Sequence, residues 1–146
     1  MAGAVGILAV LLVAGQVATG VTEEHKPSEL VGTWRGTSSC TDRVAAPACQ
    51  DEVVVYDFTP GAKPGTVTWK ADKVVEGKRV PMGEMDLAYD AGEKCWFAEF
   101  KSSRVHSTWC LVVDGTHLTG TGRLLPGKET IRKIDVKKES GRVVPH

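Results

Sequence analysis

Residues 95–118 read CWFAEFKSSRVHSTWCLVVDGTHL, and this stretch decides the fold class. Short runs rich in Trp, Phe, Val and Thr alternate with Ser102-Ser103 and Asp114-Gly115, two dipeptides that are typical of turns. Because side chains alternate between the two faces of a strand, turns at these dipeptides place the large apolar side chains on one face. The stretch therefore predicts consecutive antiparallel strands whose tryptophan-rich face is buried.

The turn positions also predict a register, which decides which side chains are neighbours. Two-residue turns at Ala91-Gly92, Ser102-Ser103 and Asp114-Gly115 pair Leu87 with Trp96, Trp96 with Trp109, Cys95 with Cys110, and Leu111 with Leu118. A slip of one residue would turn the apolar side chains to the other face. The three turns agree on one apolar face, and this agreement favours an up-and-down sheet.

Segments of the same kind recur along most of the chain, separated by Gly, Pro and Asp. The eight expected strands lie near 31–39, 51–58, 66–75, 80–89, 94–101, 105–113, 116–125 and 129–138. Such a sheet hides its apolar face by closing on itself. We therefore expect an all-β, eight-stranded antiparallel up-and-down barrel, whose interior is either filled by side chains or holds one small ligand.

The first 22 residues differ in composition from the rest, because they contain no charged side chain. Residues 4–14 form an apolar run, and Ala18-Thr19-Gly20 fits the small-residue pattern of signal peptidase sites. We expect a signal peptide over 1–20, a polar lead-in over 21–29, the barrel over 30–138 and a tail over 139–146. This predicts a secreted or periplasmic protein with no membrane span after cleavage. The alternative is an uncleaved membrane anchor.

Four cysteines follow the expected export signal, so two disulfides are predicted. Of the three possible connectivities, the local pairs Cys40–Cys49 and Cys95–Cys110 are the simplest. The chain has no Cys-x-x-Cys motif and no histidine at ligand spacing from a cysteine, so we expect no metal site and no cofactor. The balance of 18 basic and 18 acidic residues predicts no binding to nucleic acid or to an anionic membrane.

The start of the first expected strand reads Leu30-Val31-Gly32-Thr33-Trp34-Arg35-Gly36. A Gly-x-Trp motif in the first strand of an eight-stranded exported meander resembles the calycin superfamily, which includes lipocalins, fatty-acid-binding proteins and avidins. The resemblance implies that Trp34 lies at the closed end of the barrel and that a basic residue of the last strand packs over it. Arg132 is the matching candidate. Residues 49–56 look like those of uncharacterised bacterial lipocalin-like exported proteins.

The residues expected to face the interior are the candidates for binding a ligand. They are Trp34, Tyr56, Trp69, Met85, Trp96, Trp109 and Arg132. Filling of the core is the alternative role for the aromatic side chains. Gly120 and Gly122 would leave space beside Trp109. The direction of Arg132 depends on a turn: three residues at 125–127 point it inward beside Gly122, where it could meet a ligand carboxylate, and two residues point it outward.

No set of residues predicts catalysis. The four histidines are scattered, and Glu99 and His106 form an expected cross-strand pair on the outer face. We therefore expect a non-enzymatic protein that binds a small apolar or amphipathic molecule. The alternative is a protein-binding module, such as a protease or lysozyme inhibitor, that presents the disulfide-closed loop 41–48 with Arg43 as its anchor. A structural envelope domain without a ligand is a third possibility.

Overall fold

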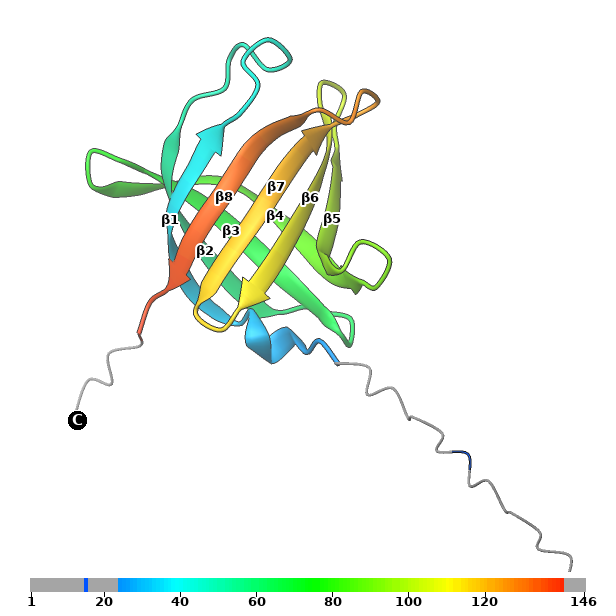
Figure 1. Ribbon diagram of the computed structural model, residues 1–146. Helices are drawn as coiled ribbons and strands as arrows, with labels where there is room; N and C mark the ends of the chain where they lie inside the picture. The colour runs from blue at the N-terminus through cyan, green and yellow to red at the C-terminus, as the bar shows by residue number, and fades with distance from the viewer. Residues whose placement is uncertain (1–14, 16–23, 141–146) are drawn as a thin grey trace, which may run out of the picture.

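The computed structural model describes residue 15 and residues 24–140, and its strands close into a barrel in sequence order (Figure 1). All neighbouring strands are antiparallel. The strands are β1 (Gly32–Cys40), β2 (Glu52–Pro60), β3 (Thr66–Val75), β4 (Lys78–Asp90), β5 (Cys95–Lys101), β6 (His106–Asp114), β7 (His117–Leu124) and β8 (Thr130–Lys138). The eight-stranded up-and-down barrel predicted from the sequence is confirmed. Apart from residue 15, the predicted signal peptide lies outside the described residues.

The inner face carries the large apolar side chains, as the alternation of residues predicts. The buried residues that the strands contribute to this core are Trp34, Val54, Tyr56, Phe58, Val67, Trp69, Leu87, Trp96, Ala98, Leu111, Leu118, Ile134 and Val136. Every strand contributes at least one of them. One continuous interior core therefore holds the barrel together through apolar burial.

The three predicted registers are wrong by two residues. Trp96 pairs with Tyr89 on β4 and with Leu111 on β6, and Leu111 pairs with Gly120 on β7. The β4–β5 and β5–β6 connections are two residues longer than predicted, because Asp90 pairs with Cys95 and Lys101 with His106. A shift of two residues keeps every side chain on its own face, so the predicted inner face survives.

The β6–β7 turn shows the cause of its shift most clearly. Asp114 pairs with His117, so the turn residues are Gly115 and Thr116 rather than Asp114 and Gly115. Gly115 has a φ of 61°. Glycine is favoured at the first central position of a type II′ turn, where a positive φ is required. The turn is therefore placed by the glycine and not by the Asp-Gly pair.

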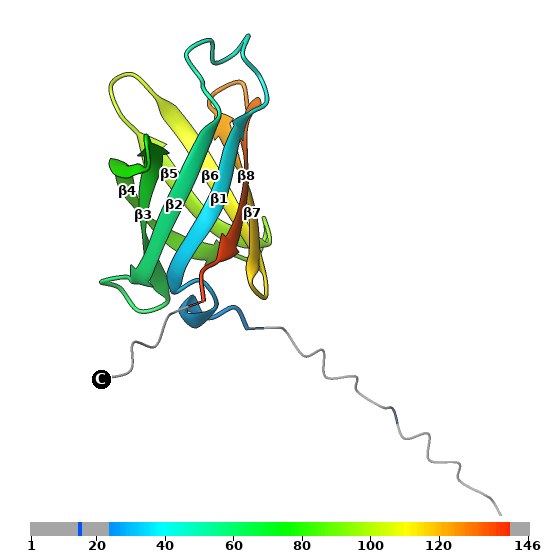
Figure 2. The same ribbon diagram turned by 90° about the vertical axis from the view of Figure 1, so that its left-hand side faces the viewer.

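One end of the barrel is closed by the chain that precedes β1. The short 3₁₀ helix η1 (Pro27–Glu29) lies across this closed end (Figure 2). Trp34 is buried there, and its Nε1 donates a hydrogen bond to the Leu30 carbonyl oxygen at 2.8 Å. This is the place that the resemblance to calycins implies for Trp34.

The basic residue over Trp34 is Lys138, and the assignment of Arg132 to this role is wrong. The Lys138 ammonium lies 5.6 Å from the centre of the Trp34 ring, within reach of a cation–π interaction. The β1–β8 register explains the difference, because Trp34 pairs with Lys138 whereas Arg132 pairs with Cys40 at the other end of β1. Arg132 therefore lies toward the opposite end of the barrel.

Both predicted disulfides are present. Cys40–Cys49 closes the loop between β1 and β2, and Cys95–Cys110 joins β5 to β6. Cys110 pairs with Phe97 in the ladder, so the second bridge runs diagonally rather than directly across as predicted. Each bridge constrains a short loop of the unfolded chain and so favours the folded state.

The barrel wall is opened between β4 and β5. These strands share three residue pairs at the closed end, from Ala88↔Phe97 to Asp90↔Cys95. Within the described part of the chain, residues 78–87 of β4 have no pairing with β5. They follow β3 instead, through a register shift at Ala71/Asp72, and the tip of the β3–β4 hairpin projects away from the barrel (Figure 1).

Candidate functional site

The barrel is hollow at the end opposite η1, which we call the open end. A cavity of about 310 Å³ lies there, lined by residues of β1 to β6 and β8, and we call it the open-end cavity. The β1–β2 loop rises above this end, as the two views show (Figures 1 and 2). The interior is thus filled by side chains at the closed end and open to a small ligand at the other.

Aromatic rings form one boundary of the open-end cavity. Tyr56 and Trp69 meet edge to face with ring centres 5.0 Å apart, and Trp69 and Trp109 do the same at 5.7 Å. Trp109 Nε1 donates to Ser107 Oγ at 3.1 Å. Trp69 Nε1 is buried without a hydrogen-bond partner among the described residues. Tyr56 and Trp69 are each only 2 % exposed, so the partly buried Trp109 ring offers most of the aromatic surface at this boundary.

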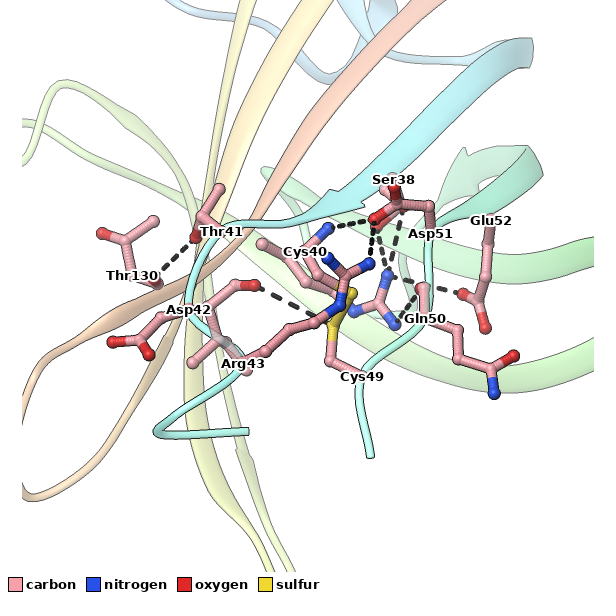
Figure 3. Close-up of a disulfide and its surroundings, with 12 residues drawn as sticks. Ser38, Cys40, Thr41, Asp42, Arg43, Cys49, Gln50, Asp51, Glu52 and Thr130 are labelled. Carbon is pink, nitrogen blue, oxygen red and sulfur yellow. Dashed lines mark hydrogen bonds and ion pairs between the residues drawn. A yellow bond between two sulfur atoms is a disulfide. The ribbon is translucent and has the colours of Figure 1, made fainter. Parts of the chain in front are cut away.

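Arg132 supplies the polar wall. It faces Gly122 across the β7–β8 ladder and points inward, as the longer of the two turns predicted. Its Nη1 donates to Ser38 Oγ at 3.0 Å, and its Nη2 donates to the Gln50 carbonyl oxygen at 3.0 Å. Glu52 Oε2 lies 3.6 Å from Nη1. Ser38, Gln50 and Glu52 come together beside the Cys40–Cys49 disulfide (Figure 3).

The Tyr56 hydroxyl belongs to the same polar group. Burial raises the pKa of this hydroxyl far above its usual value, and a hydrogen bond with Ser38 and the charge of Arg132 offset only part of the rise. Tyr56 is therefore neutral at any physiological pH and keeps a proton that it can donate.

The opposite wall of the open-end cavity is apolar and lies at the gap between β4 and β5. Met85 lies deeper, and Met82, Phe100 and Val105 lie at the mouth. The last three are large hydrophobic residues that are nonetheless 42–43 % exposed. Exposed apolar side chains gathered round a cavity mouth are typical of a ligand-entry route.

The loop beside the polar wall is held in one conformation. The Asp42 carboxylate accepts hydrogen bonds from the backbone N–H groups of Val44 and Ala45, at 3.0 and 2.9 Å. Asp51 accepts from the Cys40 N–H at 2.7 Å and from Arg43 at 3.3 Å (Figure 3). These contacts and the disulfide fix the position of Gln50, whose carbonyl holds Arg132.

Five of the seven predicted interior residues line the open-end cavity. They are Tyr56, Trp69, Met85, Trp109 and Arg132. Trp34 and Trp96 do not line it, because they lie in the core at the closed end. There the Trp96 Nε1 donates to the Glu29 carboxylate at 2.6 Å, which ties η1 to β5. Their role is to close the barrel.

Four polar residues of the cavity lining were not predicted from the sequence: Ser38, Glu52, Glu84 and Ser107. Glu52 and Ser38 lie at strand ends, on the same faces as the buried Tyr56 and Trp34. A charged or hydroxyl side chain at an inward position is the signal that could have found them. The Glu99 carboxylate and His106 Nε2 do pair on the exposed surface, through a hydrogen bond of 2.6 Å.

Within residue 15 and residues 24–140, no group of three or more histidine, cysteine or acidic side chains is placed to hold a metal ion. Nor does any helix in this part of the chain have the length and apolar character needed to cross a membrane.

The fold and the cavity define an eight-stranded up-and-down barrel that is plugged at one end and hollow at the other. Among solved structures, the chain is similar to the siderocalin Ex-FABP, which is described as functioning through dual ligand specificities. The two share 10 % identity, with a TM-score of 0.49 over 80 % of this chain and 78 % of that chain. This likeness assigns no ligand to the present barrel. No protein-family model and no curated protein sequence matches the chain.

Proposed function

We propose that the protein is an exported, non-catalytic barrel that binds a small apolar or amphipathic molecule in the open-end cavity. The observation that carries this proposal is a cavity of about 310 Å³, bounded by aromatic rings and open at the β4–β5 gap. Ligand pockets typically measure about 300–1,000 Å³. The volume suits a compact molecule, or one end of a longer amphiphile whose remainder lies along the exposed apolar mouth.

The cavity has one polar wall and one apolar wall, which face each other. Arg132, Glu52 and Ser38 stand on β8, β2 and β1, whereas Met85 and Phe100 stand on β4 and β5. A bound amphiphile would place its polar group against the first wall and its apolar part against the second. The two disulfides support export, because such bridges persist in oxidising compartments. We also propose that the protein is related to the bacterial lipocalin-like exported proteins that residues 49–56 resemble.

Native mass spectrometry of protein purified without denaturation tests the proposal. We expect the wild-type barrel to carry a small-molecule adduct, or to take up added octanamide. Gly83→Leu should abolish both the adduct and the uptake of octanamide. Gly83 lines the cavity, and a Cβ added there meets no atom within 4 Å, so the leucine side chain can occupy the ligand's space without displacing the protein. Thr119→Leu adds the same side chain at an exposed position of β7 and is the matched control. A Gly83→Leu protein that binds like wild type would contradict the proposal.

Protein binding through loop 41–48 is the second candidate function. It is favoured by the rigidity of the loop and by the 94 % exposure of Val44 beside Arg43. Stapled loops bind with little ordering cost. Incubation with trypsin tests this candidate: stable inhibition supports it, and simple cleavage after Arg43 contradicts it.

A further inference from the structure

We propose that Glu52, beside Arg132, makes the open-end cavity select an uncharged polar head group and reject a carboxylate. A lone inward arginine would favour anions, because its guanidinium matches the geometry of a carboxylate. The side chains of Arg132 and Glu52 are 16 % and 19 % exposed, so this charge pair lies inside the barrel. The inference rests on the proposed function and names the class of ligand: a neutral amphiphile with a primary amide or a hydroxyl at one end.

Arg132 is already largely occupied by the protein. Its Nη1 donates to Ser38 Oγ, and it also lies 3.3 Å from the Ser38 carbonyl oxygen. Its Nη2 donates to the Gln50 carbonyl oxygen. Three of its five N–H groups are thus used by the protein, and only Nε–H and one Nη2–H remain for a ligand.

Glu52 differs from Arg132, because few hydrogen-bond donors of the protein lie near its carboxylate. Among the described residues its nearest cationic partners are Arg132 at 3.6 Å and Lys73 at 3.9 Å, both beyond ordinary hydrogen-bond length. The carboxylate lines the open-end cavity. A partly buried acceptor that borders a cavity favours a ligand that donates a hydrogen bond to it.

The charges around the head-group position support the same conclusion. Arg132 and Glu52 together make the polar wall neutral. Lys73 is not part of the cavity lining, and at 39 % exposure its charge is screened by water. Glu84 lies at the mouth, where it is exposed and pairs with Lys70. A carboxylate against Arg132 would therefore meet the negative charge of Glu52 at close range, with no second cation in the lining to offset it.

A primary amide fits this wall atom by atom. Its carbonyl oxygen can accept from an Arg132 N–H, and its NH₂ group can donate to Glu52. An alcohol satisfies the same two partners with one oxygen. A carboxylate has acceptors alone, so it leaves Glu52 unpaired and brings a second negative charge into a partly buried site.

Octanoate and octanamide are the matched probes for the test, because they differ in the head group and share the chain. Their dissociation constants are measured at pH 7 by titration calorimetry against wild type, Glu52→Gln and Glu99→Gln. We expect wild type to bind octanamide more tightly. The ratio of the octanoate constant to the octanamide constant should fall at least about tenfold in Glu52→Gln, the effect of removing one nearby charge in a partly screened site. Glu99→Gln is the control, because Glu99 is exposed and does not line the cavity, and its ratio should stay within about twofold of wild type.

The outcomes separate this inference from the function on which it rests. Tight binding of octanoate by wild type, or a ratio unchanged by Glu52→Gln, overturns the role of Glu52 and leaves the ligand-binding function standing. Failure of wild type and of Glu52→Gln to bind either probe overturns both. Circular dichroism verifies that the variants are folded. If Glu52→Gln does not fold, the wild-type protein alone provides the test: tighter binding of octanamide than of octanoate supports the inference, and the reverse overturns it.

Discussion

Gly122 shows how one residue sets the shape of the cavity wall. A Cβ at this position would lie 2.6 Å from Cζ3 of Trp109, so the ring can lie against β7 only because the residue is glycine. The sequence suggested that Gly120 and Gly122 leave space next to Trp109. The structure shows that the space at Gly122 is taken by the Trp109 ring itself, and that at Gly120 by Leu111. These glycines serve close packing.

Glu52 is a residue whose inward position could have been predicted from the sequence and was not. It lies two residues before Val54 and four before Tyr56, on the inward-facing side of β2. The alternation that predicted the aromatic face also places this carboxylate inside. What alternation does not predict is its distance from Arg132, because that distance depends on the β1–β2 and β1–β8 registers.

Tyr56 makes the stability of the protein depend on pH in the alkaline range. Its pKa is about 10 in the unfolded chain and is raised in the folded protein, chiefly by burial. The folded state therefore resists losing this proton, and its stability is complete below pH 10 and falls as the pH rises above it. One such group costs about 1.4 kcal/mol per pH unit. Urea unfolding of wild type and Tyr56→Phe between pH 9 and 11 measures the effect.

We expect Tyr56→Phe to reduce the alkaline slope by about one proton. Tyr89→Phe removes the hydroxyl of the other tyrosine and serves as the matched comparison. Equal slopes for wild type and Tyr56→Phe would show that the Tyr56 hydroxyl is not buried as the structure has it.

At the scale of elements, side-chain period predicted the strands well, and turn chemistry predicted their register poorly. Eight strands and their inner faces follow from alternation, which any register shift of two residues preserves. Turn lengths at 91–94 and 102–105 do not follow from it. The divergence of β4 from β5 was not predicted either, because it depends on the β3–β4 register shift at Ala71/Asp72. The mouth of the cavity is therefore a feature that the sequence alone did not reveal.

The Cys40–Cys49 loop links stability to the polar wall. Replacing both cysteines by serine should cost about 2–3 kcal/mol of unfolding free energy, because the bridge closes a short loop. Without the disulfide, Gln50 is no longer held in place, so Arg132 should lose its hydrogen bond to the Gln50 carbonyl oxygen. Octanamide binding should then weaken several-fold. The Cys95/Cys110 double serine variant is the control, since that bridge does not line the open-end cavity. It should lose similar stability and keep the wild-type affinity. Equal affinity losses in the two variants would contradict this link.

At the scale of the whole molecule, the barrel has two ends with different tasks. The closed end is sealed by η1, Trp34 and Trp96, and the open end holds a cavity with one polar and one apolar wall. The four tryptophans are divided between these ends, with Trp69 and Trp109 at the cavity. Each indole N–H therefore reports on a defined part of the interior.

The most direct test of the account is an ¹H–¹⁵N spectrum of the indole N–H groups recorded while octanamide is added. If the ligand binds at the open end, the signals of Trp69 and Trp109 shift progressively and saturate together, whereas those of Trp34 and Trp96 stay in place. Four unmoved signals at saturating octanamide, or shifts largest at Trp34 and Trp96, would contradict a ligand site at the open end.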